Sequence, residues 1–184
     1  MVGREGRRHV DAVKHVADIV QHAGVSSVIE AFEVSTMLDD ALKLNSPSFE
    51  RHGITVERHF ADLPEILIDK HRVMQILFNL VKNARESLLE APRDVRRLVL
   101  RTYVDDERLR IEIEDSGVGI ASENLNRVLS HGFTTKKSGH GFGLHSCANA
   151  AKEMGGSLTV FSDGPGTGAT FTLDLPFAPA EALV

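Results

Sequence analysis

One segment, residues 70–89, constrains the fold of this chain more than any other. Apolar side chains cover most of its helical surface, which predicts a helix buried around most of its girth. The apolar positions are Val73, Met74, Ile76, Leu77, Phe78, Leu80, Val81, Ala84 and Leu88. The polar residues between them form a narrow stripe: Arg72, Gln75, Asn79, Lys82, Asn83 and Glu86. We expect the apolar surface to pack on a sheet, which leaves the polar stripe as the uncovered side.

The rest of the chain supplies the strands of such a sheet. Alternating apolar residues predict strands over 32–34, 54–59, 66–68, 96–104, 109–114, 157–161 and 169–175. Helical spacing predicts further helices over 35–44, 121–129 and 141–154. Asp69 is suited to cap the helix at 70–89. Because helices and hairpin-connected strands are mixed, the expected fold class is α+β, a two-layer sandwich of helices on a mixed, mostly antiparallel sheet.

The composition is that of a soluble domain with a short extension. The chain has 184 residues, of which 42% are hydrophobic, and its formal net charge of −5 argues against nucleic acid as a partner. No apolar stretch reaches the length of a membrane span, so we expect a cytoplasmic protein, with membrane anchoring of a longer form left open. The single cysteine, Cys147, excludes an internal disulfide and is expected to be a buried structural thiol.

The first thirty residues are expected to form a separate unit. An apolar residue recurs there every three or four positions, one stripe of an amphipathic helix: Val10, Val13, Ala17 and Val20. Gly24 can end this helix. A single stripe of small side chains needs another helix to pack on. We therefore divide the chain into residues 1–30 and 31–184, and expect the first unit to be one arm of a helical hairpin or intersubunit bundle.

Two asparagines in the helix at 70–89, Asn79 and Asn83, need an explanation, because asparagine is a poor interior helix former. On composition alone, an ordinary solvated face accounts for the polar stripe around them. The alternative is the wall of a pocket, where an amide oxygen can complete the octahedral shell of a magnesium ion held mainly by phosphates and water. The helix by itself leaves both interpretations open.

Residues 111–120 are predicted to be a strand that runs into a glycine turn. Asp115 at the end of this strand can accept a hydrogen bond from an exocyclic amine. Gly117 and Gly119 would let a flat ring approach the backbone. Asp-Ser-Gly is also common in plain strand-to-loop turns, so this motif alone does not identify a ligand.

A second glycine motif places Gly139, Gly141 and Gly143 at alternate positions, a spacing that excludes a strand or a stable helix. A helical pattern begins immediately afterwards. A glycine-rich loop that opens into a helix N-terminus favours phosphate binding, because free backbone N–H groups and the helix dipole point there. Just upstream, Phe133-Thr-Thr-Lys136 adds hydroxyls and a cation, although an exposed lysine on a loop would look the same.

Together these motifs resemble the ATP-binding catalytic domain of sensor histidine kinases, which belong to the superfamily of DNA gyrase, the MutL repair ATPases and the 90-kilodalton heat-shock chaperone. The resemblance covers residues 31–177. It comprises an N box at 79–83, a first glycine box at 115–120, an F box at 133–136, a second glycine box at 139–144 and a glycine-containing strand at 166–171. The Thr-Thr-Lys form and the Asn-Ala-x-x-Ser ending of the helix are similar to kinases of the nitrogen-regulation type.

The resemblance implies ATP and magnesium as cofactors. Asn83 would ligate magnesium, Asp115 would contact the adenine amine, and Lys82 with Lys136 would contact phosphates. The full set of implied ATP-binding residues is Asn79, Lys82, Asn83, Asp115, Gly117, Gly119, Ile120, Thr134, Thr135, Lys136, Gly139, Gly141, Gly143, Leu144 and Thr170.

One departure bears on the reaction. Gln75 stands where gyrase-like ATPases carry a glutamate that activates water, and an amide cannot act as a base. This favours transfer of the γ-phosphate to a histidine over hydrolysis. An ATPase of the gyrase or MutL kind and a non-catalytic nucleotide-binding module remain the alternatives. Glu86 occupies a place where many kinases carry a basic residue, which weakens the case for phosphate contacts from that turn.

The phosphoacceptor motif of the family is not found in residues 1–30. His9, His15 and His22 lack its context, a following acidic residue and then Thr, Asn or Pro. The resemblance therefore implies that residues 1–30 are the C-terminal helix of a dimerisation and phosphoacceptor domain, and that the acceptor histidine lies on an upstream helix. The expected partners are that helix, a second copy in a full-length homodimer, and a response regulator or receiver domain. The sequence indicates neither the stimulus nor which response regulator.

Overall fold

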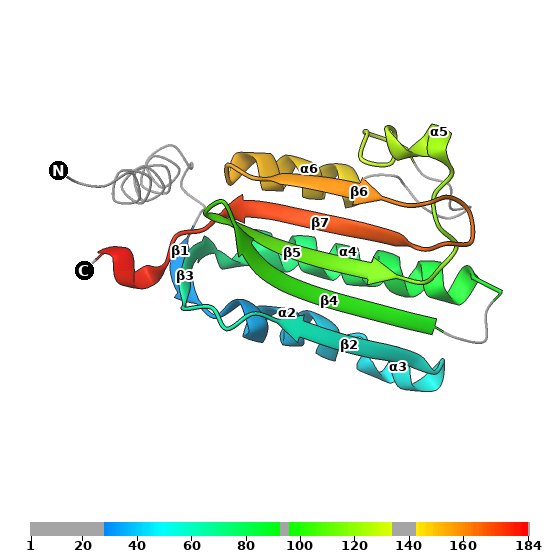
Figure 1. The fold of residues 1–184 in the computed structure, drawn as a ribbon, viewed down its shortest axis with the longest axis horizontal. Coiled ribbons are helices and arrows are strands. Elements are labelled where there is room, and N and C mark those ends of the chain that lie inside the picture. The colour runs from blue at the N-terminus through cyan, green and yellow to red at the C-terminus, as the bar shows by residue number, and fades with distance from the viewer. Residues whose placement is uncertain (1–27, 93–95, 134–142, 184) are drawn as a thin grey trace.

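The computed structural model describes residues 28–92, 96–133 and 143–183, and its centre is a five-stranded sheet (Figure 1). The strand order is β2-β4-β5-β7-β6. Their bounds are β2 Ile54–Phe60, β4 Arg96–Asp105, β5 Arg108–Asp115, β7 Ala169–Pro176 and β6 Ser157–Phe161. The pairing of β2 with β4 is parallel and the other three pairings are antiparallel.

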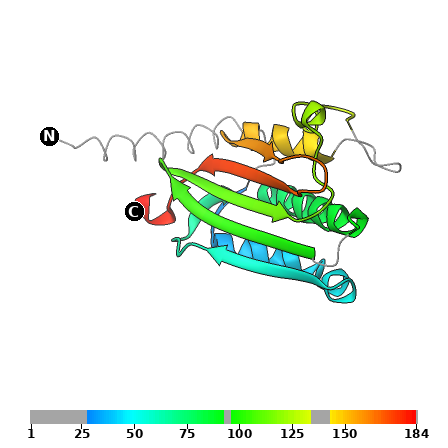
Figure 2. The same ribbon diagram turned by 45° about the vertical axis from the view of Figure 1, so that its right-hand side comes forward.

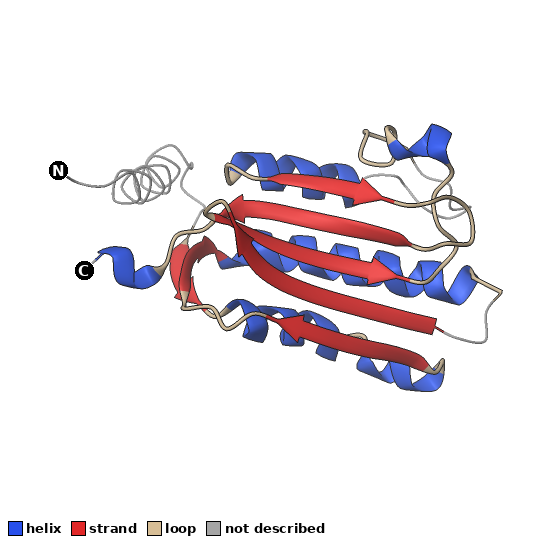
Figure 3. Cartoon of the chain, viewed as in Figure 1, coloured by secondary structure: helices blue, strands red, loops and turns tan. Residues whose placement is uncertain are grey.

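The longer helices lie together on one face of this sheet, as the two ribbon views and the secondary-structure colouring show (Figures 1, 2 and 3). They are α2 Val34–Lys43, α3 Ser46–Arg51, α4 Lys70–Glu90 and α6 Gly143–Glu153. A short helix, α5 Ser122–Leu125, and a 3-10 turn, η1 Ala180–Leu183, complete the described helical elements. The arrangement is the α+β fold of helices on a mixed, mostly antiparallel sheet that the sequence predicts.

The central helix α4 packs as its sequence predicts. Seven apolar side chains along it are buried: Val73, Ile76, Leu77, Leu80, Val81, Ala84 and Leu88. The facing strands contribute alternate residues to the same core, among them Leu98, Leu100, Ile111 and Ile113. The carboxylate of Asp69 accepts a hydrogen bond from the backbone N–H of Arg72, so the predicted N-cap of α4 is confirmed.

The opposite face of the sheet is covered by charged side chains. Arg97 and Arg101 each hold the carboxylate of Glu114, at 2.9 Å and 2.7 Å, and Arg108 pairs with Asp174. Because side chains alternate along a strand, Glu114 faces these arginines while the next residue, Asp115, faces the helices. This alternation determines which residues reach the functional site.

Four features of the fold differ from the sequence prediction. The helix expected over 121–129 is only the short α5, Ser122–Leu125. A strand expected over 32–34 is β1 Ile29–Phe32, which pairs with β3 Ile66–Asp69 in a separate two-stranded sheet. The strand ends earlier because α2 begins at Val34, and its cap position is Glu33. The hydroxyls of Ser35 and Thr36 donate to the Glu33 carboxylate. Helices α3 and η1 are too short to produce a readable periodicity.

The hairpin between β4 and β5 is confirmed. Its turn residues, Asp106 and Glu107, both have positive φ angles, 48° and 59°. A two-residue turn with positive φ at both positions matches the right-handed twist of the flanking strands. The helix predicted within residues 1–30 lies outside the described residues, and so does the loop at 134–142. In the described part of the chain, no helix has the length and apolar character needed to cross a membrane.

Cys147 is buried in α6, and burial raises the pKa of its thiol to about 11, against a small opposing effect of a hydrogen bond with Asn79. At pH 8 we therefore expect the thiolate to be roughly a hundredfold rarer than in the unfolded chain, where the pKa is near 9. Reaction with a thiol-specific disulfide reagent should be slow for the native protein and fast in denaturant. Equal rates in the two states would contradict the buried placement.

Candidate functional site

The candidate site begins at the C-terminal end of β5, where the chain turns away from the sheet at Asp115. This carboxylate is buried, with 3% of the residue exposed. Its Oδ1 atom accepts hydrogen bonds from the backbone N–H of Gly117 and from the hydroxyl of Ser87, both at 2.8 Å. A buried carboxylate held by two donors keeps a fixed orientation, which is what recognition of a ligand amine requires.

The loop after Asp115 needs glycine for steric reasons. A Cβ atom at Gly117 would overlap the Ser87 hydroxyl and the Asp115 carboxylate. Gly119 has a φ of +70°, and a Cβ there would overlap the carbonyl oxygen of Gly164. The glycines predicted to admit a flat ring are therefore also required by close contacts within the protein itself.

A second serine fastens the far half of this loop. The hydroxyl of Ser162, which follows β6, accepts a hydrogen bond from the N–H of Ile120 at 3.0 Å and donates to the carbonyl of Gly168 at 2.6 Å. The N–H of Gly166 donates to the carbonyl of Val118 at 2.6 Å. The loop at 115–120 is thus tied to the turn between β6 and β7, as well as to α4.

Neither serine was a predicted site residue. Ser87 appeared only as the last position of the Asn-Ala-x-x-Ser motif, although it follows Asn83 by four residues and so lies on the same side of α4. Ser162 lies in a turn whose glycines and proline gave no indication of a buried hydroxyl. A position one helical turn beyond the N box is the signal that could have identified Ser87.

The structure brings the N box together with the end of the second glycine box. The Oδ1 atom of Asn79 lies 3.5 Å from where a Cβ of Gly143 would stand, and the Asn79 side chain is hydrogen-bonded with Cys147. Its Nδ2 group donates to the carbonyl of Gln75 at 3.0 Å. Since Gly143 begins α6, the amide of Asn79 lies beside the N-terminus of that helix.

Lys82 and Asn83 extend this side of α4. Lys82 is exposed, and its Nζ atom is 3.9 Å from the carboxylate of Glu86. Glu86 is thus close enough to compete with a phosphate for Lys82. This agrees with the expectation from the sequence that an acidic residue here weakens phosphate contacts. Asn83 is half-buried, one helical turn after Asn79 and one before Ser87. The side chains of Ile120 and Leu144 pack partly buried against the core at either border of the site.

The sheet register does not bring Thr170 to the face of the sheet that carries Asp115. In the register of the sheet Thr170 pairs with Glu114, and both lie on the charged outer face, whereas Asp115 pairs with Ala169. Because side chains alternate, Ala169 is the residue of β7 on the same face as Asp115. Five further predicted residues lie outside the described ranges: Thr134, Thr135, Lys136, Gly139 and Gly141.

A comparison with protein-family models decides the family. The model described as "Histidine kinase-, DNA gyrase B-, and HSP90-like ATPase" matches residues 68–179. This chain belongs to that family. The match contains α4, β5 with its glycine loop, α6 and β7, the elements that build the site described above.

Within the family the relatives are sensor kinases. "Sensor histidine kinase ZraS" of Escherichia coli K12 is 30% identical over 177 residues, 96% of this chain and 37% of ZraS. "Sensor protein TdiS" of Thauera aromatica is 32% identical over 146 residues, 78% of this chain and 26% of TdiS. The chain therefore spans about a third or less of the length of these relatives.

Solved structures of histidine kinases are similar to this chain in fold. Full-length ShkA in complex with AMPPNP is 27% identical, with a TM-score of 0.74 over 94% of this chain and 36% of ShkA. The catalytic domain of histidine kinase ThkA has the same fold, with a TM-score of 0.71 at 23% identity over 84% of this chain and 99% of that domain. The chain thus contains the ATP-binding domain of a sensor histidine kinase. Membership of the nitrogen-regulation subgroup stays a prediction.

The side chains fit a metal that arrives with the nucleotide. Among the described residues, no three His, Cys, Asp or Glu side chains gather into a metal-binding group. Magnesium typically takes only one or two protein ligands and completes its shell with phosphates and water. The amide of Asn83, half-buried on α4 between Asn79 and Ser87, suits such a single ligand.

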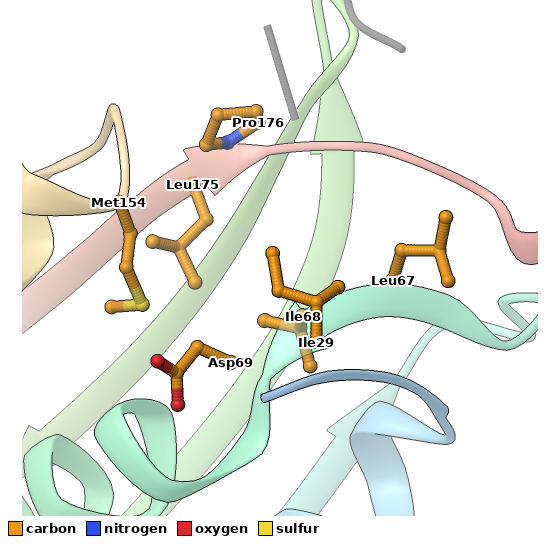
Figure 4. Close-up of a pocket in the computed structure, with 7 residues that line it drawn as sticks. All are labelled: Ile29, Leu67, Ile68, Asp69, Met154, Leu175 and Pro176. Carbon is orange, nitrogen blue, oxygen red and sulfur yellow. The ribbon is translucent and has the colours of Figure 1, made fainter. Parts of the chain in front are cut away.

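A small cavity lies at the other end of the sheet (Figure 4). It is lined by Ile29, Leu67, Ile68, Asp69, Met154, Leu175 and Pro176. Pro176 pairs with Arg108 at the start of β5, whereas Asp115 ends that strand. The cavity volume of about 30 Å³ is far below the several hundred Å³ of typical ligand pockets, so this cavity is too small for a nucleotide.

Proposed function

We propose that this chain is the phosphate-donor part of a two-component histidine kinase. It binds Mg-ATP and transfers the γ-phosphate to a histidine on an upstream helix of a longer protein, from which the phosphate passes to an aspartate of a response regulator. The observation that carries the proposal is the buried Asp115 carboxylate, held by two donors at the mouth of a glycine loop. An acceptor in this setting suits the amine of an adenine ring.

Different residues of the site contact different parts of the nucleotide. Asp115 accepts from the adenine amine, and Asn83 ligates magnesium. The phosphates lie toward Asn79 and the N-terminus of α6, where backbone N–H groups and the helix dipole favour negative charge. Lys82 and Lys136 neutralise the charge that spreads over the transferred phosphoryl group. Transfer then depends on positioning and charge rather than on a general base of this domain.

Gln75 supports transfer to a histidine over hydrolysis. Its side chain is exposed on α4, one turn before Asn79, on the side of the helix that carries the N box. An amide there has no basic site to accept a proton from water. The histidine acceptor needs no such base, because a neutral imidazole nitrogen is itself a nucleophile.

The proposal extends to partners and location. The helix expected within residues 1–30 supplies the second helix of a dimerisation hairpin, so the full-length protein is a homodimer in which the donor site meets the acceptor helix. The domain works in the cytoplasm, where ATP and the response regulator are found. Magnesium is the metal, as the single amide ligand Asn83 suits it.

The test has two arms. Calorimetry should show ATP binding by the chain with Mg²⁺ present, and weaker binding with EDTA. A longer version that includes the upstream helix should become labelled on histidine with γ-labelled ATP. If that version binds ATP and is never labelled, the chain is a nucleotide-binding module without kinase activity. Steady release of phosphate by the chain alone would instead favour an ATPase.

A further inference from the structure

The hydroxyl of Ser87 lies between two groups that leave it a single hydrogen-bonding arrangement. It is 2.8 Å from Oδ1 of Asp115 and 3.1 Å from the backbone nitrogen of Val118. The Val118 N–H can only donate, so the serine oxygen accepts this bond. The serine hydrogen is therefore directed at the Asp115 carboxylate. The direction of the hydroxyl is fixed by the backbone of the loop whose carboxylate it holds.

We propose that Ser87 is a positioning residue that sets the preference of this site for adenine, by holding the Asp115 carboxylate in the orientation that accepts from a ring amine. The inference rests on the proposed function, since it assumes that Asp115 contacts the purine.

The geometry explains why orientation matters here. Oδ1 of Asp115 receives both the Ser87 hydroxyl and the Gly117 N–H, which determines the plane of the carboxylate. A 6-amino purine offers a donor to a carboxylate held in this way, whereas a 6-oxo purine offers an acceptor and is repelled. Discrimination of this kind is large only where the polar group of the protein cannot turn away. Without Ser87, Oδ1 of Asp115 loses one of the donors that hold it.

The placement of Ser87 on α4 fits this role. Asn79, Asn83 and Ser87 follow one another at intervals of four residues, so they lie along one side of the helix. Asn79 lies beside the N-terminus of α6, and Ser87 lies eight residues away beside Asp115, about 12 Å along the helix axis. One rigid helix thereby contacts the site at its phosphate end and at its base end.

Ser162 provides a matched control. Like the half-buried Ser87, the buried Ser162 has a hydroxyl that accepts from a backbone N–H of the same loop, in this case that of Ile120. Its hydroxyl donates to the carbonyl of Gly168 instead of to Asp115. Removing either hydroxyl should loosen the loop, but only the loss of Ser87 should change how the carboxylate is held.

The experiment compares affinity for Mg-ATP and Mg-ITP, its 6-oxo analogue, by calorimetry on the whole chain. Ser87→Ala should weaken ATP binding about tenfold and ITP binding less than twofold, the scale of one lost hydrogen bond to a charged group. Ser162→Ala should weaken both nucleotides by the same factor. Ser87→Cys keeps the volume with a poorer donor, and should give an intermediate shift if the alanine variant does not fold.

A double-mutant comparison separates positioning from structural support. In an Asp115→Ala background, Ser87→Ala should leave the ATP-to-ITP affinity ratio unchanged, because no carboxylate remains to be held. Equal loss of both nucleotides in the single Ser87→Ala variant would overturn the inference while leaving the proposed function intact. A wild-type chain that binds neither nucleotide would overturn the proposed function, and the inference with it.

Discussion

Replacing Gly168 with alanine is expected to destabilise the fold by about 3 kcal/mol or more, a large share of the stability of a domain this size. Gly168 has a φ of +80°, and a Cβ there would overlap the carbonyl oxygen of Asp115. The Cβ position is fixed by the backbone at residue 168 and the oxygen belongs to the backbone of Asp115, so neither atom can turn aside. The Asp115–Ala169 pair at this end of the ladder would have to open, which would also displace the carboxylate of Asp115.

Gly166→Ala is the control for Gly168→Ala. Its φ of +81° is nearly the same, but a Cβ there would meet no described atom within 4 Å. The Gly166→Ala variant should therefore lose only the roughly 1–2 kcal/mol of folding free energy that an alanine at positive φ costs. Thermal melts followed by circular dichroism should show a midpoint lowered by about 10 °C for Gly168→Ala and by clearly less for the control. Equal midpoints would mean that the contact with Asp115 does not constrain the turn.

Long elements were predicted from the sequence because their burial is periodic. Helix α4 is buried on the residues that the helical pattern selects, and burial along β5 and β7 alternates as their sequences do. The parallel pairing of β2 with β4 and the separate β1–β3 sheet could not be predicted, since neither is connected by a hairpin. Strand pairing between distant segments depends on tertiary packing, which local patterns do not encode.

The sequence predicted the position of a candidate residue where its motif restricts the local backbone. Asp115 and its glycines lie as expected because a strand end followed by two glycines restricts the backbone strongly. Thr170 is one residue away from Ala169, the β7 residue on the face of Asp115, and in a strand one residue reverses the face. Ser87 and Ser162 were missed because a hydroxyl that bonds to a remote loop leaves no local pattern. Such contacts appear only when the loop and the helix are placed in space.

Asp115→Asn is expected to weaken ATP binding about a hundredfold while leaving the fold intact, since a charge-assisted hydrogen bond is lost and a donor now faces a donor. If the asparagine keeps its oxygen toward Ser87 and Gly117, its amide nitrogen faces the adenine amine. If the side chain is flipped, the same nitrogen faces those two donors of the protein. The first orientation preserves the loop, so the conflict falls on adenine and not on stability.

The same substitution should improve binding of ITP relative to ATP, because the amide nitrogen can donate to a 6-oxo group. Asp163→Asn removes an equal charge from an exposed residue in the neighbouring turn, and should leave both affinities unchanged. Calorimetric titration of the two variants with Mg-ATP and Mg-ITP checks the expectation, and a melting curve checks the fold. If Asp115→Asn binds ATP as tightly as the wild type, the purine amine is not recognised by this carboxylate, and the buried pair of donors around Asp115 serves only to hold the loop.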